Sequence, residues 1–276
     1  MKYITATTIT TALLCVDLAS AAKFTEARRA RHAERRAAGS AIRSSAPKIP
    51  STGLNAVQQM QIASNGTDRN VEYSSNWAGA VLVGSGYTSV TGTFTVPTPS
   101  GEGAASAWVG IDGDTATNSI LQAGLDFYSE DGEVSFDAWY EWYPDYAYDF
   151  TGISISSGDQ VKVTVTADTT SSGTAVIENL TTNQTVTHSF SGESDSLQEL
   201  NAEWIVEDFE EGNSLVDFAD FGTVTFTNAV ATTSSGSTVA AGDDNGELTI
   251  LDIEQDGTVL TSVSVEGDSV TVKYLS

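Results

Sequence analysis

The basic residues of this 276-residue chain are confined to its first quarter. Ten of the twelve Lys and Arg residues lie at or before Arg69, whereas 33 of the 37 Asp and Glu residues follow it. Residues 1–70 carry ten basic and four acidic side chains, a net charge of +6, and residues 71–276 carry two and 33, a net charge of −31. A domain this acidic repels itself near neutral pH and is relieved as its carboxylates take up protons. This uneven distribution of charge predicts two segments that the cell processes differently, and it predicts that the acidic segment works in acid.

The first 21 residues have the features of a secretory signal peptide. Lys2 precedes an apolar run from Ile4 to Leu18, and small residues follow at the expected cleavage positions. We expect residues 1–21 to be removed and the product to be secreted to the extracellular space without a membrane anchor, since no later stretch is long and apolar enough. Cys15 lies within the signal, so the mature protein has no thiol and no disulfide.

Residues 22–70 are expected to be a basic propeptide. The segment from Lys23 to Arg43 is rich in Ala, Arg and Glu, which favours helix but offers almost no apolar face, and Ser44–Asn70 has the composition of a linker. A disordered basic tail is the alternative. We favour a removable propeptide, held on the acidic domain by charge and released by protonation, with the mature N-terminus between Ser64 and Ser74.

Residues 71–276 predict one all-β domain, a sandwich of two antiparallel sheets of the jelly-roll or concanavalin-like kind. The length suffices for a single large core. Four segments alternate apolar and polar residues as half-buried strands do: 161–166, 222–227, 248–253 and 270–274. Turn residues such as Asp256-Gly257 separate them. Acceptor sequences for N-glycosylation begin at Asn179 and Asn183 in one apparent hairpin, which predicts a glycoprotein.

The composition disfavours several classes of function. His188 is the single histidine after residue 70, and no serine context for a catalytic triad accompanies it, so we expect it on a strand surface. One histidine and no cysteine argue against catalytic zinc, and we expect no cofactor. The acidic loop Asp112-Gly113-Asp114 leaves structural calcium open, although no EF-hand pattern is present. Nucleic acid should be repelled by the negative charge, and a monomer is expected.

Residues 135–144 combine acids and aromatic rings in one predicted strand. Side chains alternate between the two faces of a strand. One face then carries acids and rings suited to a polymer-binding cleft: Asp137, Trp139, Glu141 and Tyr143. The other face suits a core: Phe136, Ala138, Tyr140 and Trp142. An aromatic outer face with solvated acids is the alternative interpretation.

Two further residues are candidates for catalysis. Glu203 should share a strand face with Ile205 and Glu207, and a carboxyl group on a partly apolar face should have a raised pKa, as a general acid or base requires. A glutamate at the rim of an amphipathic strand is an equally good interpretation of that pattern. Gln122 lies in an apolar stretch, where it is either a buried structural amide or a donor to a developing oxyanion.

Five motifs follow one another along the domain: Ser75-Asn76-Trp77-Ala78-Gly79, the stretch from Ala107 to Gly113, Leu121-Gln122-Ala123-Gly124, the stretch from Trp139 to Pro144, and the stretch from Ala202 to Asp208. Together they resemble the glutamic peptidases, or eqolisins, a family of fungal acid endopeptidases. The resemblance implies a β-sandwich with the cleft on a concave face, polypeptide substrates, and activity that pepstatin does not inhibit.

The resemblance also implies roles for individual residues. Glu203 would activate a water molecule as general base, and Gln122 would hold that water and stabilise the oxyanion. The positions matching the family's cleft would bind substrate: Trp77, Trp108, Asp112, Asp126, Asp137, Trp139, Glu141 and Tyr143. No metal is implied. A β-sandwich glycoside hydrolase and a carbohydrate-binding module are the alternatives, since paired carboxylates and Trp residues also suit sugars.

Overall fold

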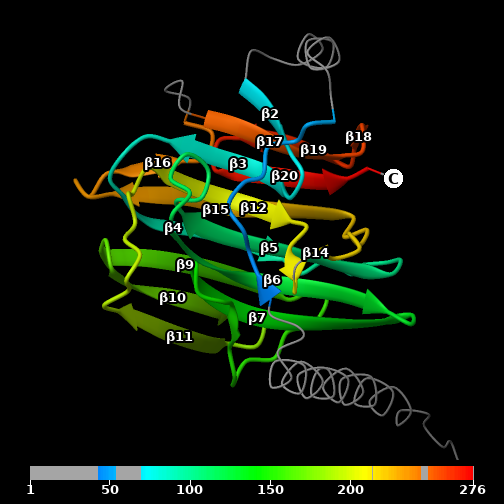
Figure 1. Ribbon diagram of the computed structural model, residues 1–276. Coiled ribbons are helices and arrows are strands. Elements are labelled where there is room, and N and C mark those ends of the chain that lie inside the picture. The colour runs from blue at the N-terminus through cyan, green and yellow to red at the C-terminus, as the bar shows by residue number, and fades with distance from the viewer. Residues whose placement is uncertain (1–42, 54–69, 213, 244–247, 276) are drawn as a thin grey trace, which may run out of the picture.

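The computed structural model describes residues 43–53, 70–212, 214–243 and 248–275. Two large β-sheets pack face to face, and a short blue segment crosses the exposed face of one of them (Figure 1). Residues 1–21, expected to be the signal peptide, and residues 22–42 and 54–69 of the expected propeptide lie outside the described residues. Within the described part, no helix is long and apolar enough to cross a membrane.

One sheet, here called the back sheet, has eight strands. In spatial order its strands are β11 (Gln184–Ser191), β10 (Ser172–Asn179), β9 (Gln160–Thr169), β4 (Tyr87–Thr95), β15 (Thr223–Thr233), β20 (Ser269–Tyr274) and β19 (Thr261–Glu266), with β16 (Thr238–Ala240) paired to β15. All of its printed pairings are antiparallel.

The other sheet, here called the front sheet, has nine strands. In spatial order they are β18 (Thr258–Val259), β17 (Leu248–Gln255), β3 (Trp77–Val83), β12 (Asn201–Glu207), β5 (Gly103–Ile111), β6 (Ile120–Glu130), β7 (Glu133–Tyr143) and β8 (Tyr148–Asp149), with β2 (Asn70–Ser74) beside β17. The β2–β17 pair is parallel. A small third sheet contains β1 (Arg43–Ser44), β13 (Glu210–Glu211) and β14 (Ser214–Leu215).

The core lies between the two large sheets, and the strands contribute alternate side chains to it. The four segments predicted to be strands fall within β9, β15, β17 and β20, apart from Gly222, which directly precedes β15. Phe94 of β4 contacts Phe226 of β15 at 5.2 Å and Phe127 of β6 at 6.4 Å between ring centroids, so aromatic edges join the sheets. The prediction of an all-β sandwich is confirmed.

Strand β7 shows the predicted division into two faces. Phe136, Ala138 and Trp142 belong to the core between the sheets, with Tyr140 packed against it. Trp139 belongs instead to a second apolar cluster on the outer face of the front sheet, against which Tyr143 packs. The outer face of the front sheet therefore carries large buried rings of its own.

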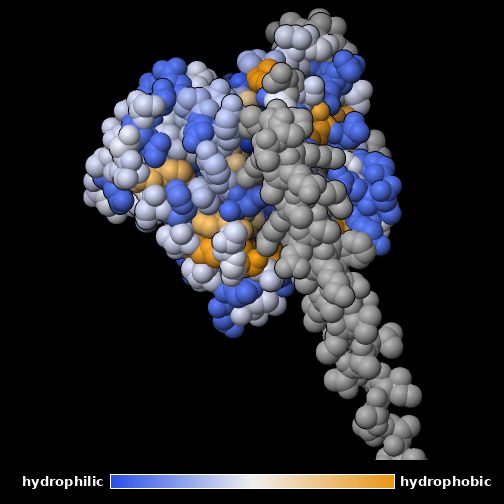
Figure 2. All heavy atoms as spheres, turned by 60° about the horizontal axis from the view of Figure 1, so that its bottom comes forward, coloured by the Kyte–Doolittle hydropathy of each residue, from blue (hydrophilic) through white to orange (hydrophobic). Residues whose placement is uncertain are grey.

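On the side shown in Figure 2 hydrophilic residues surround small apolar patches. The predicted hairpin with both glycosylation sequences is β10–β11. Asn179 is buried and its amide nitrogen donates to Ser154 O and Asp159 Oδ2, whereas Asn183 is exposed in the turn. Of these two asparagines, only Asn183 presents its side chain to a modifying enzyme.

Residues 44–53 were predicted to be linker, and for this stretch the prediction is wrong. Its backbone bonds to the folded domain, with Ser51 N donating to Tyr73 O at 3.0 Å and Ser75 N donating to Ile49 O at 2.8 Å. These partners are more than twenty residues away in the chain. Composition reports local preference and contains no information on such contacts.

The aromatic bridge between the sheets generates a stability prediction. Phe94→Ala should lower the free energy of unfolding by about 3–5 kcal/mol, because it removes buried apolar area and leaves a cavity against Phe127 and Phe226. Urea titration near neutral pH measures this change. Leu180→Ala, at a side chain 43% exposed, is the control and should change stability by less than about 0.5 kcal/mol. Equal effects of both substitutions would contradict the prediction.

Candidate active site

Four adjacent strands, β12, β5, β6 and β7, align their outward side chains in rows. The antiparallel register places residues of the four strands directly opposite one another. The first row is Glu203, Gly110, Gln122 and Glu141. The second row is Ile205, Trp108, Gly124 and Trp139. The third row is Glu207, Ser106, Asp126 and Asp137. Rows two residues apart share a face, so the chemical groups of all three lie on the outer side of the front sheet.

Glycines leave space within the rows. A Cβ atom on Gly110 would lie 2.8 Å from Glu203 Oε1 and 2.8 Å from the Trp108 ring. On Gly124 it would lie 2.4 Å from the Cβ of Trp108. Gly110 stands between Glu203 and Gln122 in the register, so no side chain separates these two groups. The room that Gly110 leaves is taken up by the Glu203 carboxyl group and the Trp108 ring.

Glu203 is fully buried, and its surroundings disfavour the charged form of its carboxyl group. Burial raises its pKa well above the ordinary value, and the nearby charges of Asp112 and Asp114 raise it further. Neither carboxyl oxygen has a hydrogen-bond partner among the described residues. The raised pKa expected from the strand pattern is confirmed. A buried, unpaired carboxyl group is costly for stability and is found at functional sites more often than in ordinary cores.

Asp112 holds the start of the strand that carries Glu203. Its two carboxylate oxygens accept hydrogen bonds from the backbone N–H groups of residues 198–201 at 2.6 to 3.2 Å. Burial raises the pKa of Asp112, and the four amide donors oppose that rise. Asp112 is expected to bind substrate, but in the structure both of its oxygens are occupied by the protein's own backbone.

Glu207 joins two tryptophans and was not among the expected site residues. Trp108 Nε1 donates to Glu207 Oε2 at 2.8 Å, and Trp77 Nε1 donates to Glu207 Oε1 at 3.3 Å. The two indole rings meet edge to face at 4.9 Å. Burial raises the pKa of Glu207 to about 8, against the opposing effect of Arg43. Glu207 lies four residues after Glu203 on the same face, and this spacing was the signal that could have identified it.

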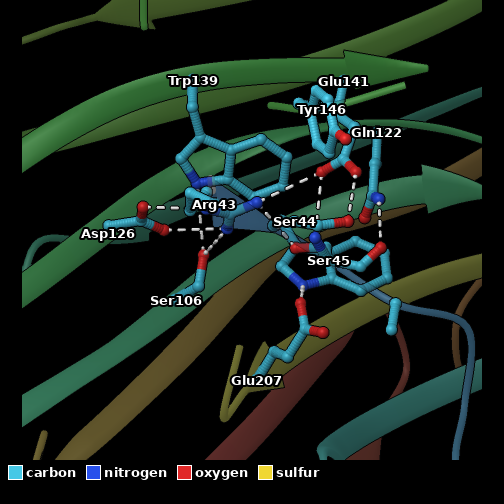
Figure 3. A network of polar contacts seen from close by, with 12 residues as sticks. Arg43, Ser44, Ser45, Ser106, Gln122, Asp126, Trp139, Glu141, Tyr146 and Glu207 are labelled. Carbon is cyan, nitrogen blue, oxygen red and sulfur yellow. Dashed lines mark hydrogen bonds and ion pairs between the residues drawn. The ribbon is translucent and has the colours of Figure 1, made fainter. Parts of the chain in front are cut away.

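Residues 43–53 cross the outer face of the front sheet, from β7 towards β2 (Figure 1). Gln122 Nε2 donates to the carbonyl oxygen of Ser45 at 3.1 Å (Figure 3). Ser45 N donates to Glu141 Oε2 at 3.0 Å, and Trp77 Nε1 donates to Ala46 O at 3.1 Å. The side chains of the site therefore bind the backbone of this segment.

Arg43 is the most extensively bound residue of the segment. Its Nε and Nη2 donate to the two oxygens of Asp126 at 3.0 and 2.9 Å, and Nη1 donates to Glu141 Oε2 at 3.2 Å (Figure 3). The guanidinium carbon lies 3.7 Å from the ring centroid of Trp139. Burial lowers the pKa of Arg43 and the surrounding acids raise it, with a net rise, so the side chain stays charged. Burial also raises the pKa of Glu141 to about 8, and Arg43 opposes this rise.

Lys48 forms a second ionic anchor. Its ammonium group contacts Asp114 closely and lies 2.9 Å from Glu72 Oε2. Asn76 accepts from Ile49 N through Oδ1 at 2.9 Å, and its Nδ2 donates to the carbonyl oxygens of Ala46 and Pro47. Cations at both ends of residues 43–48 are thus paired with acids of the folded domain.

The structure brings together most of the residues expected in the site. The outer face carries Trp77, Trp108, Gln122, Trp139, Glu141 and Glu203, with Asp126 and Asp137 in the third row and Tyr143 packed beside them. Sequence reasoning did not identify Arg43, Ser45, Ser106, Gly110 or Glu207 as parts of the site. In the described ranges, no group of three or more His, Cys, Asp and Glu side chains is arranged to hold a metal ion.

The chain has relatives among known proteins. The profile of the peptidase A4 family matches residues 75–274. The chain belongs to the peptidase A4 family. It is 56% identical to aspergillopepsin-2 of Aspergillus niger over all of both chains, and 44% identical to scytalidopepsin B of Scytalidium lignicola over 86% of this chain and 90% of that one.

A solved structure shares the fold as well. A crystal structure of scytalido-glutamic peptidase with a transition state analog inhibitor superposes with a TM-score of 0.68 and 45% identity, covering 73% of this chain and 98% of that one. The resemblance to the glutamic peptidases is confirmed, and the chain is a glutamic endopeptidase of the peptidase A4 family.

The buried acids of this peptidase generate a prediction on pH and stability. A carboxyl group whose pKa is raised by folding stabilises the protein below its unfolded pKa of about 4.3, and this contribution is lost as the pH rises through the folded pKa. For Glu207 the folded value is about 8. The free energy of unfolding should therefore fall between these values, and Glu207→Gln should make that fall shallower.

The measurement is urea unfolding of the full-length chain across this pH range. Glu266→Gln, at an exposed position on β19, is the matched control and should leave the slope unchanged. Parallel profiles for Glu207→Gln and its parent would show that Glu207 does not titrate as proposed.

Proposed function

We propose that the chain is a secreted acid endopeptidase, made as a zymogen, in which Glu203 and Gln122 form the catalytic dyad. One observation carries this assignment. The Gln122 amide binds a backbone carbonyl, that of Ser45, and stands opposite Glu203 with only Gly110 between them. An amide donor on a peptide carbonyl and a carboxyl group with a raised pKa can supply the oxyanion donor and the general base for attack by water on a peptide bond.

The reaction follows from these two groups. Glu203 in its ionised form takes a proton from a water molecule while the water oxygen attacks the carbonyl carbon of the substrate. The resulting oxyanion accepts a hydrogen bond from Gln122 Nε2, which is neutral and keeps its protons in acid. The C–N bond then breaks, and Glu203 returns the proton to the leaving nitrogen. Neither step needs a metal or a cofactor.

Residues 43–53 support the zymogen assignment. The segment places its own backbone over Gln122, where a substrate would bind. Burial raises the pKa of Glu203, and a protonated carboxyl group is no general base. We propose that loss of the segment admits water to this face and lowers the pKa of Glu203.

The propeptide is proposed to leave in acid. Arg43 and Lys48 are held by the carboxylates of Asp126, Asp114 and Glu72. The attraction between this basic segment and the acidic domain weakens as the net negative charge of the domain falls in acid, and the domain is relieved of its own repulsion at the same time. Export to an acidic extracellular medium would therefore trigger activation.

A carbohydrate-directed function is the alternative from the sequence. A glycosidase needs two carboxyl groups flanking one bond, and a binding module needs no general base. Membership of a peptidase family favours the peptide substrate. The amide of Gln122 also has a direct use in peptide hydrolysis and none in the two-carboxylate mechanism.

The dyad generates the first activity prediction. Glu203→Gln should reduce cleavage of an unfolded protein at about pH 4 by roughly 10²–10⁴-fold, because it removes the general base. Gln122→Ala should reduce kcat by roughly 10²–10³-fold, because it removes the oxyanion donor. Cleavage is measured with pepstatin present, and Gln160→Ala, at an exposed position on β9, is the control. Equal cleavage by wild type and Glu203→Gln would disprove the dyad.

The proposed propeptide generates a prediction on the rate of maturation. Arg43→Gln should raise the rate at which the full-length chain matures at about pH 5 by roughly tenfold, because it breaks the contacts to Asp126 and Glu141. Mass spectrometry of the processed chain over time gives the rate. Lys162→Gln removes a cation from the back sheet and should have no effect. A maturation rate that does not change between acid and neutral pH would contradict the mechanism of release.

A further inference from the structure

Two segments of the chain near Glu203 hold each other in place. Residues 112–116 follow β5, and residues 198–201 lead into β12, which carries Glu203. The backbone N–H groups of residues 198–201 donate to the carboxylate of Asp112, and the N–H of Asp112 donates to Asn201 O at 3.1 Å. In the other direction, Asn201 Oδ1 accepts from the N–H groups of residues 115 and 116 at 2.9 and 3.2 Å. The start of β12 is therefore fixed from both sides.

These contacts also fix Asp112 itself. Its φ of 69° lies in the left-handed region, and its side chain is fully buried. A residue with a Cβ atom occupies this region only where its surroundings favour it, although Asp tolerates it better than most. Asp112 comes two residues after Gly110, which stands opposite Glu203 in the register. The carboxylate of Asp112 is therefore held where its charge acts on Glu203.

The two carboxyl groups differ in how well they hold a negative charge. Asp112 accepts four backbone hydrogen bonds, whereas neither oxygen of Glu203 has a hydrogen-bond partner among the described residues. Hydrogen bonds to a carboxylate favour its charged form, so Glu203 takes up the first proton as the pH falls and Asp112 keeps its charge. The charges of Asp112 and Asp114 raise the pKa of Glu203 and bring this protonation to a higher pH.

The bound segment supplies the cations near these acids. Lys48 pairs with Asp114, and Arg43 pairs with Glu141 in the row of Glu203. Both cations leave with the segment. The basic side chains of the domain itself lie on the back sheet: Lys162, His188 and Lys273. Glu199, beside Asp112, adds a further acid. Once the segment has left, no basic residue of the domain's front sheet offsets the charges of Asp112 and Asp114.

We propose that Asp112 and Asp114 are positioning residues for the reaction: Asp112 fixes the start of the strand that carries Glu203, and the charges of both set the lowest pH at which Glu203 acts as general base. This inference rests on the proposed function, because it requires that Glu203 be ionised during attack. Asp112 then acts through Glu203 and does not bind substrate.

The test is the pH profile of kcat/KM for a peptide substrate between about pH 2 and pH 6. Each variant is matured in acid from the full-length chain. The value falls on the acid side as Glu203 takes up a proton. Loss of a neighbouring negative charge makes Glu203 harder to protonate, so Asp112→Asn and Asp114→Asn should each move the acid-side midpoint to lower pH, by roughly 0.5–1 pH unit. Asp168→Asn, at an exposed position on β9, is the matched control and should leave the midpoint unchanged.

The fixing of β12 has a separate readout. At a pH above both midpoints, Asp112→Asn should lower kcat by roughly tenfold with little change in KM, because Glu203 is then less well placed and no substrate contact is lost. A rise in KM with kcat unchanged would show that Asp112 binds substrate, and would overturn its role in positioning.

The remaining outcomes separate this inference from the proposed function. Failure of the wild-type enzyme to cut more than Glu203→Gln would overturn the proposed function itself. An acid-side midpoint that stays at the wild-type value in Asp114→Asn, or in a folded Asp112→Asn, would overturn the role of these charges and leave the dyad intact. Asp114 accepts none of the hydrogen bonds described for residues 198–201, so Asp114→Asn decides the matter even if Asp112→Asn does not fold.

Discussion

The strict alternation of side chains across the front sheet is the constraint on which the rest of the structure depends. Each of β12, β5, β6 and β7 places every second residue in the core and the others on the outer face. Because these four strands pair in antiparallel register, their outward side chains lie opposite one another and form rows. A slip of one residue in any strand would exchange its core and site residues, so the core that stabilises the fold also fixes the geometry of the site.

The site shows how burial and function oppose each other in this fold. Glu141, Glu203 and Glu207 are fully buried, and burial raises the pKa of each. Ion pairing with Arg43 and hydrogen bonds from indole N–H groups offset part of that cost for two of them. Glu203 has no such compensation among the described residues. The carboxyl group proposed for catalysis is therefore the one that the fold leaves least stabilised.

Much of the fold was predictable because it follows from the alternation of apolar and polar residues along each strand. The alternation in β9 and β20 and the two faces of β7 follow from the order of residues alone. Motif resemblance pointed to Gln122 and Glu203, which the structure places in one row of the front sheet. The row formed by Glu207, Ser106 and Asp126 was not predictable, since it depends on which strands are neighbours and in what register. Neither was the binding of Arg43, whose partners lie 83 and 98 residues away.

The covalent connection between the bound segment and the folded domain has a consequence for the proposed latency. Residues 54–69 join the segment to β2, so the segment occupies the site as an intramolecular ligand with a high effective concentration. A cut anywhere in this connection makes the same contacts bimolecular. Occupancy then depends on dilution, so the segment proposed to inhibit the enzyme would leave the site faster in a large volume than in a confined one.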